Sequence, residues 1–206
     1  MDESKRNVTV ISVNQTPLIS FHGQLLPFYA YMGQQEVVGQ FGPRGIHITN
    51  NEIPLGWVGP YQSDMACVDE AVERILSDDP DSILVPRVML EPGEWYRALH
   101  PDELCRMEDG EPGVPGGRWA GVSLASARWR DEASEALARF LTHVLSAPYA
   151  DHFAGVLWCA GSSFEWGHNR SPHWPELLLD HSPAMRHAFR EWLHRAYDTP
   201  ECLSQA

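Results

Sequence analysis

Glu165 follows the most informative segment of the chain, in which the apolar run FAGVLWCAG ends at glycine and gives way to SSFEWGH. A run of this length is typical of a strand covered on both faces, as in a parallel sheet with helices around it. Catalytic groups gather where such strands end. The rings of Phe164 and Trp166 would raise the pKa of the Glu165 carboxyl and suit it to donate a proton. A loop glutamate in a surface salt bridge fits the same residues.

The composition favours a neutral ligand that is rich in hydroxyl groups. The chain has 206 residues, enough for one domain with a real core, and a formal net charge of -13. We expect no nucleic-acid partner, because phosphate binding needs clustered basic residues and the chain has only 15 Lys and Arg against 28 acids. Eight Trp residues suit a sugar ligand, because indole faces stack on sugar C–H faces, although Trp is also a large core residue.

Polar and aromatic side chains follow two further apolar runs, GIHIT and ILVPRVML. Near the first run, His47 and Asn50 could hydrogen-bond sugar hydroxyls or could satisfy a loop backbone, and Glu52 is a further candidate. After the second run, Glu91 could contact a sugar or could pair with an arginine such as Arg87. Glu94 follows it closely. Three tryptophans are either sugar platforms at the mouth of the site or packing residues: Trp57, Trp95 and Trp166.

Several kinds of chemistry have no support in the sequence. The four cysteines show no CxxC pairing, and His168 and His173 lack a third ligand in register, so we expect no metal and no disulfide framework. No GxGxxG, GxxxxGK[ST] or GxSxG motif occurs, so we expect no cofactor and neither nucleotide nor serine-hydrolase chemistry. The absence of a signal-type segment and of a long uncharged apolar run predicts a cytoplasmic protein with no membrane partner.

The elements that must position these residues alternate between strands and helices. Residues 1–24 read as an N-terminal β-hairpin extension, and residues 25–206 as the main domain. The loop at 50–62 and the region at 99–122 are too turn-rich for regular structure. The predicted strands cover about 28–32, 45–49, 83–90 and 153–161. Pro86 lies within the third of them and removes a hydrogen-bond donor, so we expect a bulge or a strand start there. The predicted helices cover 64–77, 126–146 and a segment that starts at Ser182-Pro183. This alternation predicts an α/β fold with a parallel sheet.

Four such units would make half of a (β/α)8 barrel, so the sequence predicts a partial TIM barrel of roughly the first four βα units. A half barrel has two open edges, which natural proteins normally cover. Either a second copy in a homodimer or a C-terminal barrel half covers these edges. The alternative is that the sheet is an open one and not part of a barrel.

Several segments together resemble the N-terminal half of the bacterial glycoside hydrolases related to β-galactosidases that carry their active site on a (β/α)8 barrel. The matching segments are GIHITNNEIPLGWVGP, ILVPRVMLEPGEWY with the following HPDEL, SARWRDEASEALARFLTHVLSAPYADHFAGV, and CAGSSFEWGH. They cover nearly all of residues 25–200.

The resemblance implies that Glu165 is the general acid/base, because this family places that glutamate at the end of the fourth strand. The family's nucleophile, at the end of the seventh strand, would lie beyond residue 206, and Phe164 stands where many members have Asn. Retaining hydrolysis needs two carboxyl groups roughly 5 to 5.5 Å apart. The expected function is therefore a β-galactosidase-like glycoside hydrolase that is incomplete as it stands, or else an inactive carbohydrate-binding or structural module.

Overall fold

The computed structural model describes residues 8–27, 29–33, 35–112, 121–160, 180–197 and 199–204. The chain divides into two compact units. Unit 1 contains residues 1–56, 64–89 and 138–158, and unit 2 contains residues 57–63, 90–137 and 159–206.

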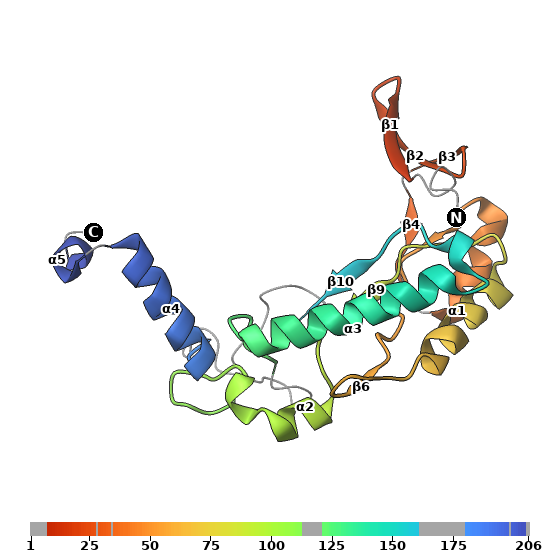
Figure 1. Ribbon diagram of the computed structural model, residues 1–206. Coiled ribbons are helices and arrows are strands. Elements are labelled where there is room, and N and C mark those ends of the chain that lie inside the picture. Colours follow the sequence, from red (N-terminus) through yellow and green to blue (C-terminus); the bar gives the residue numbers. More distant parts are fainter. Residues whose placement is uncertain are drawn as a thin grey trace. The chain divides into compact units, whose positions relative to one another are not determined.

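The N-terminal part of unit 1 is an antiparallel sheet of three strands, β1 (Thr9–Val13), β2 (Thr16–Phe21) and β3 (Gln24–Pro27), drawn in red to orange in Figure 1. Two-residue turns join the strands, and both residues of each turn have positive φ: Asn14 and Gln15 in the first, His22 and Gly23 in the second. Such turns match the twist of the strands that they connect. The predicted hairpin is therefore present, and a third strand extends it.

A parallel sheet follows in unit 1, with β4 (Ala30–Tyr31), β5 (Ile48–Thr49) and β8 (Ile83–Leu84) in that order. Its hydrogen bonds continue past the strand ends, because Val85 N–H donates to Thr49 O and Arg87 N–H donates to Asn51 O, at 3.0 and 2.9 Å. Pro86 has no N–H, and it separates β8 from β9 (Arg87–Met89). The sequence predicted one strand here with an irregularity at this proline.

The fourth predicted strand is β10 (Leu157–Cys159), which pairs with β9. The backbone bonds from Ala154 N–H to Leu84 O and from Leu157 N–H to Pro86 O advance in the same direction along both segments, so this pairing is parallel. The regular strand is shorter than the predicted run of 153–161. Along the sheet, the parallel strands stand in the order in which they occur in the chain.

Two helices supply the other buried side chains of unit 1. Helix α1 (Ala66–Asp78) buries Val68, Val72 and Ile75, and helix α3 (Ala127–Ser146), whose last turns belong to this unit, buries Phe140 and Val144. Both helices agree with the predicted ones, because an apolar stripe at 3.6-residue spacing is a local signal. Three short 3-10 helices complete the unit: η2 (Gln35–Gln40), η3 (Gly42–Arg44) and η5 (Ala150–His152).

One core cluster joins the two sheets of unit 1. Phe21 and Leu26 of the antiparallel sheet pack with Ile48 and Ile83 of the parallel sheet. Since alternate residues of a strand share a face, Asn50 and Glu52 follow Ile48 on this face, and Val85 and Arg87 follow Ile83. The face is therefore apolar where the strands begin and polar where they end. The opposite face carries Thr49, Asn51 and Ile53, all of them buried.

Unit 2 differs more from its prediction. The supposed loop at 50–62 contains the hairpin strand β6 (Trp57–Gly59), which pairs with β7 (Gln62–Ser63). A short helix, α2 (Glu94–Leu99), and the 3-10 helix η4 (Pro101–Glu103) lie where no helix was predicted. Helix α4 (Pro183–Ala196) begins as predicted, because the Ser182 side chain accepts a hydrogen bond from Met185 N–H at 3.1 Å. Helix α5 (Pro200–Ser204) follows it.

The fold is thus a mixed α/β structure with several small sheets, and no closed barrel occurs among the described residues. None of the described helices has the length and apolar character needed to cross a membrane. The four cysteines, all of them described, form no disulfide; Cys105 and Cys159 are buried, whereas Cys202 is exposed. The cytoplasmic location and the boundary at residue 24 stay predictions.

Candidate functional site

Asn50, Glu52 and Arg87 form a polar group on the carboxyl side of the parallel sheet, here called the carboxyl-end cluster. The Asn50 side-chain amide donates to Val85 O at 2.5 Å, and the Asn50 carbonyl accepts a hydrogen bond from Arg87 Nε at 3.2 Å. Asn50 is buried, with 9% of its surface exposed. Because the amide nitrogen is used by Val85, the Asn50 side-chain oxygen is the atom suited to accept a hydrogen bond from a ligand hydroxyl.

Glu52 pairs with Arg87 along the backbone as a parallel bridge. Partial burial raises the pKa of the Glu52 carboxyl, and the nearby Arg87 guanidinium lowers it by less. A carboxyl group whose proton is held more tightly than usual, next to a fixed cation and a buried amide, is suited to hydrogen-bond neutral hydroxyl groups.

His47 lies at the other end of the same strand and does not join this cluster. It precedes β5, and its Nδ1 lies 2.9 Å from Asp79 Oδ2. Three residues of extended chain span about 10 Å, so His47 and Asn50 cannot act on one small ligand group. The sequence pattern grouped both residues because it predicted a strand over 45–49, whereas the regular strand β5 begins only at Ile48, after His47.

Trp57 and Trp95 come together in unit 2, together with Tyr96. The ring centroids of Trp57 and Trp95 lie 5.3 Å apart in an edge-to-face arrangement, and Tyr96 lies 5.9 Å from Trp57. Trp57 and Tyr96 are buried, and burial raises the pKa of the Tyr96 phenol to about 12. Trp95 is half-buried, and its buried Nε1 has no hydrogen-bond partner among the described residues. The aromatic group therefore packs unit 2, and Trp95 is the member that offers a surface for stacking.

Glu91 also belongs to unit 2, where its Oε2 accepts a hydrogen bond from Val122 N–H at 3.4 Å. This contact ties the segment after β9 to the segment before α3. Glu94 forms an ion pair with Arg97 at 2.9 Å on the surface of α2. Glu165 and Trp166 fall outside the described residues; β10, which precedes them in the chain, ends at Cys159.

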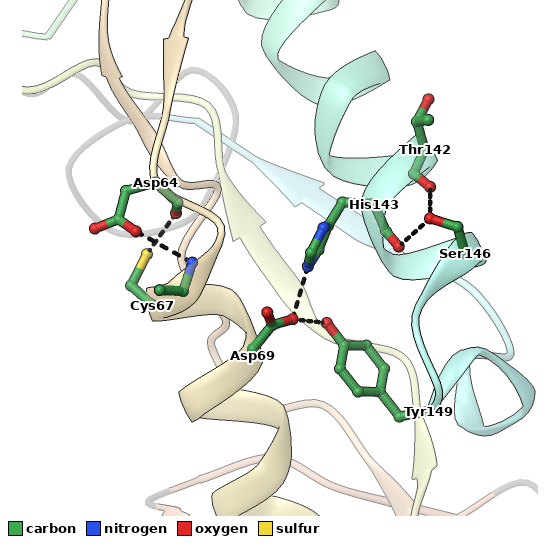
Figure 2. A network of polar contacts seen from close by, with 8 residues as sticks. Asp64, Cys67, Asp69, Thr142, His143, Ser146 and Tyr149 are labelled. Atoms are coloured by element: carbon green, nitrogen blue, oxygen red, sulfur yellow. Dashed lines mark hydrogen bonds and ion pairs between the residues drawn. The ribbon is translucent and has the colours of Figure 1, made fainter.

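A network in unit 1 around Asp69 had no counterpart in the sequence analysis (Figure 2). Asp69 Oδ1 accepts a hydrogen bond from the Tyr149 hydroxyl and lies 2.6 Å from His143 Nε2. Burial alone would raise the pKa of Asp69, but the hydrogen bonds from Tyr149 and His143 lower it. Burial and the contact with Asp69 raise the pKa of Tyr149. The partners are 74 and 80 residues apart in the chain, so no local pattern could have indicated them.

The Asp69 network lines an open cavity of about 760 Å³ between α1 and the segment that ends α3. Its other lining residues include Glu73, Leu76 and His152. The His152 Nδ1 atom is 2.9 Å from Ser82 O, so this side chain is fixed by the backbone that leads into β8. The network thus holds helices and connecting segments together in unit 1.

Comparison with known proteins gives a likeness in fold alone. No protein-family model matches the chain, and no curated protein is significantly similar to it. A crystal structure of a β-galactosidase from the psychrophilic Marinomonas ef1 matches 85% of this chain with a TM-score of 0.59 and 21% sequence identity. This chain spans 26% of that protein's chain.

Proposed function

We propose that this chain forms the first four βα units of a (β/α)8 barrel of the glycoside hydrolase type, with Glu165 as the general acid/base. The observation that carries the proposal is the order of the parallel strands. In a (β/α)8 barrel, consecutive strands are neighbours, whereas a doubly wound sheet reverses its order at a switch point. Here β4, β5 and β8 are neighbours in chain order, and β10 follows beside β9. The likeness to part of a β-galactosidase structure supports the same fold.

The polarity of the sheet supports a site on its carboxyl side. Ile48 and Ile83 join an apolar core, whereas Asn50, Glu52 and Arg87 follow them on the same face. Active sites of barrel enzymes lie at this end of the strands. Glu165 stands six positions after Cys159, the last residue of β10, in the sequence. Within unit 1 we assign sugar binding to Asn50. Within unit 2, taken by itself, we assign stacking to Trp95 and Trp166, with Trp57 packed against Trp95, and a further polar contact to Glu91.

The reaction needs a second carboxyl group. In retaining hydrolysis one carboxylic acid protonates the leaving oxygen, while a carboxylate roughly 5 to 5.5 Å away attacks the anomeric carbon. The family resemblance places the attacking glutamate after a seventh strand, beyond the 206 residues of this sequence. A C-terminal barrel half, or a second copy of this chain, would supply the missing strands.

Both edges of the parallel sheet carry exposed apolar side chains that such a partner would cover. Tyr29 and Met32 flank β4 and are 68% and 65% exposed; Leu157 and Trp158 of β10 are 49% and 52% exposed. Exposed apolar edges are sites where other strands pair. Sedimentation velocity measures whether this chain forms a homodimer. If the chain is a monomer at micromolar concentration, a second copy is not the partner, and a separate barrel half is the partner that the proposal requires.

The enzymatic assignment is tested on this chain supplied with a C-terminal barrel half, with aryl glycosides and with sugars as ligands. If Glu165 is the acid/base, Glu165→Gln lowers the rate for a poor leaving group by roughly 10² to 10⁴-fold and lowers the rate for a nitrophenyl leaving group much less. The exposed loop residue Glu108 provides the matched control, Glu108→Gln. An equal rate for Glu165→Gln and the unaltered chain on the poor leaving group contradicts the assignment.

An inactive carbohydrate-binding module is the second candidate function. Phe164 stands where many members of the family that the sequence resembles have an Asn before the acid/base residue. Titration calorimetry with simple sugars separates the two functions. Saturable binding without hydrolysis of any glycoside favours the module, and turnover that depends on Glu165 favours the enzyme.

A further inference from the structure

His47, Asp79 and Asp81 form a second cluster in unit 1, here called the amino-end cluster. His47 precedes β5, and Asp79 and Asp81 lie in the turn between α1 and β8. One ligand atom from each of the three side chains lies within 4.8 Å of the others. Within the part of the chain that the structure describes, no other three His, Cys, Asp or Glu side chains come together in this way.

The electrostatics of this place favour a cation. Helix α1 ends at Asp78 with Asp79 as its C-cap, and its last turn contains no basic residue. The carboxyl end of a helix carries a partial negative charge, which is stabilised by cations and opposed by acids. Asp78, Asp79 and Asp81 nevertheless gather there. Asp79 is only 6% exposed, so water screens its charge poorly.

The positions of the ligand atoms match those needed by a small divalent ion. Two ligands on adjacent corners of an octahedron, each about 2.1 Å from the ion, lie about 3 Å apart. The distance between His47 Nδ1 and Asp79 Oδ2 is 2.9 Å. The exposed Asp81 side chain closes the remaining distance by rotation. The Gly42 backbone lies close against the Asp79 carboxyl group, since a Cβ atom added to Gly42 would lie 2.9 to 3.1 Å from it.

We propose that the amino-end cluster is a mononuclear site for a first-row divalent cation, Zn²⁺ or Mn²⁺, with His47 Nδ1 and one oxygen each of Asp79 and Asp81 as ligands. Mixed imidazole and carboxylate donors suit these ions, and solvent completes the coordination.

The ion would join the start of β5 to the end of α1 and the start of β8. These segments lie at the amino side of the parallel strands, away from the carboxyl-end cluster. The site therefore has a structural role that is independent of any sugar chemistry, and its test does not depend on hydrolytic activity.

The experiment titrates the full chain, stripped of metal by a chelator, with ZnCl2 and MnCl2 by calorimetry, and with CaCl2 and MgCl2 for comparison. We expect one saturable site for Zn²⁺ or Mn²⁺, and a rise in Tm when the ion is added. Asp81→Asn and His47→Gln should each weaken that site at least tenfold. Glu70→Gln, which removes an exposed acid near the start of the same helix, should bind the ion like the unaltered chain.

Asp81→Asn keeps the fold intact, because the Asp81 side chain is exposed and its contact with Asp79 is made by the backbone N–H. Unaltered affinity in either variant means that the residue is not a ligand and overturns the site. Absence of saturable binding of both ions overturns it as well. Calcium or magnesium binding in preference to zinc and manganese contradicts the imidazole ligand, because these hard ions select oxygen.

Discussion

The two ends of the same parallel strands carry polar clusters of opposite character. In the amino-end cluster, buried Asp79 accepts hydrogen bonds from Ser82 Oγ at 3.2 Å and from Asp81 N–H at 3.3 Å, and its Oδ2 lies 2.9 Å from His47 Nδ1. In the carboxyl-end cluster, Glu52 is exposed and holds its proton more tightly than usual.

The difference separates a carboxylate that the fold holds with several hydrogen bonds from a carboxyl group whose pKa is raised by partial burial. A buried carboxylate with several donors is part of the structure, because removing it leaves the donors without a partner. An exposed carboxyl with a raised pKa gains little from its surroundings, which is the state expected of a group that completes its contacts with a ligand. Substitutions at the two ends should therefore act on different properties.

Asp79→Ala should have the largest effect on stability. We expect a loss of about 3 kcal/mol in the free energy of unfolding, because the change removes a buried acceptor of several hydrogen bonds and leaves the His47 and Ser82 donors unpaired. Urea denaturation in the presence of a chelator measures it, with an unchanged m-value as the sign of a pure stability effect. The exposed neighbour provides the control, Asp78→Ala, expected within about 0.5 kcal/mol. Equal small losses of unfolding free energy in Asp79→Ala and Asp78→Ala would show that the buried Asp79 carboxylate is not part of what stabilises the fold.

Asn50→Ala should have a smaller effect on stability and a separate effect on ligand binding. The loss of one hydrogen bond to Val85 O predicts about 1 to 2 kcal/mol in the free energy of unfolding. If the carboxyl-end cluster binds sugar hydroxyls, the same change weakens sugar binding, whereas Asp81→Asn leaves it unchanged. Calorimetric titration of both variants with one sugar measures this, and equal affinities would show that Asn50 does not contact the ligand.

Local patterns in the sequence were enough for the long helices and for the parallel sheet. The stripes in α1 and α3 repeat at helical spacing, and Ser182 with Pro183 marks the start of α4. Pro86 indicated the interruption between β8 and β9 because proline cannot donate to a strand. Helix α2 has only six residues and follows a glycine, so it offers too short a stripe for a periodic signal. The β6–β7 hairpin was missed because its strands have three and two residues.

The candidate site was predicted less well because its residues depend on three-dimensional neighbours. His47 and Asn50 are three positions apart in the sequence. Only the pairing of β5 with its neighbours shows that they lie at opposite ends of that strand. The Asp69 network needed the packing of α1 against residues more than 70 positions away. Trp57 and Trp95 did come together, although the hairpin that carries Trp57 was not expected. Glu165 and Trp166 stay predictions.

Asp69→Asn tests a carboxylate on helix α1, for comparison with the carboxyl groups at the two ends of the parallel sheet. The hydrogen bonds from Tyr149 and His143 lower the pKa of Asp69 below its ordinary value of 3.8, so the folded state prefers the carboxylate. This stabilisation is present above that value and is lost as the pH falls through the lowered pKa. The Asn variant should therefore differ most from the unaltered chain above pH 4 and converge with it in stronger acid. Urea midpoints across pH 2 to 7 measure this, with Glu70→Gln as the control. A difference in urea midpoint that stays constant down to pH 2 contradicts a lowered pKa for Asp69.

Glu52→Gln should have the smallest effect at neutral pH and the opposite pH dependence. Burial raises the pKa of Glu52 above 4.5, so the folded state binds its proton more tightly than the unfolded chain does. Where the folded state binds more protons, stability falls as the pH rises, here between 4.5 and the raised pKa. The Gln variant mimics the protonated carboxyl and lacks this fall, so relative to the unaltered chain it should become more stable as the pH rises through that window. The attraction of Arg87 acts against this gain and keeps it small. Urea midpoints at pH 4 and pH 7 decide the sign. A variant that is less stable than the unaltered chain at pH 7 would mean that Glu52 is a structural carboxylate like Asp79, and the two ends of the sheet would no longer differ.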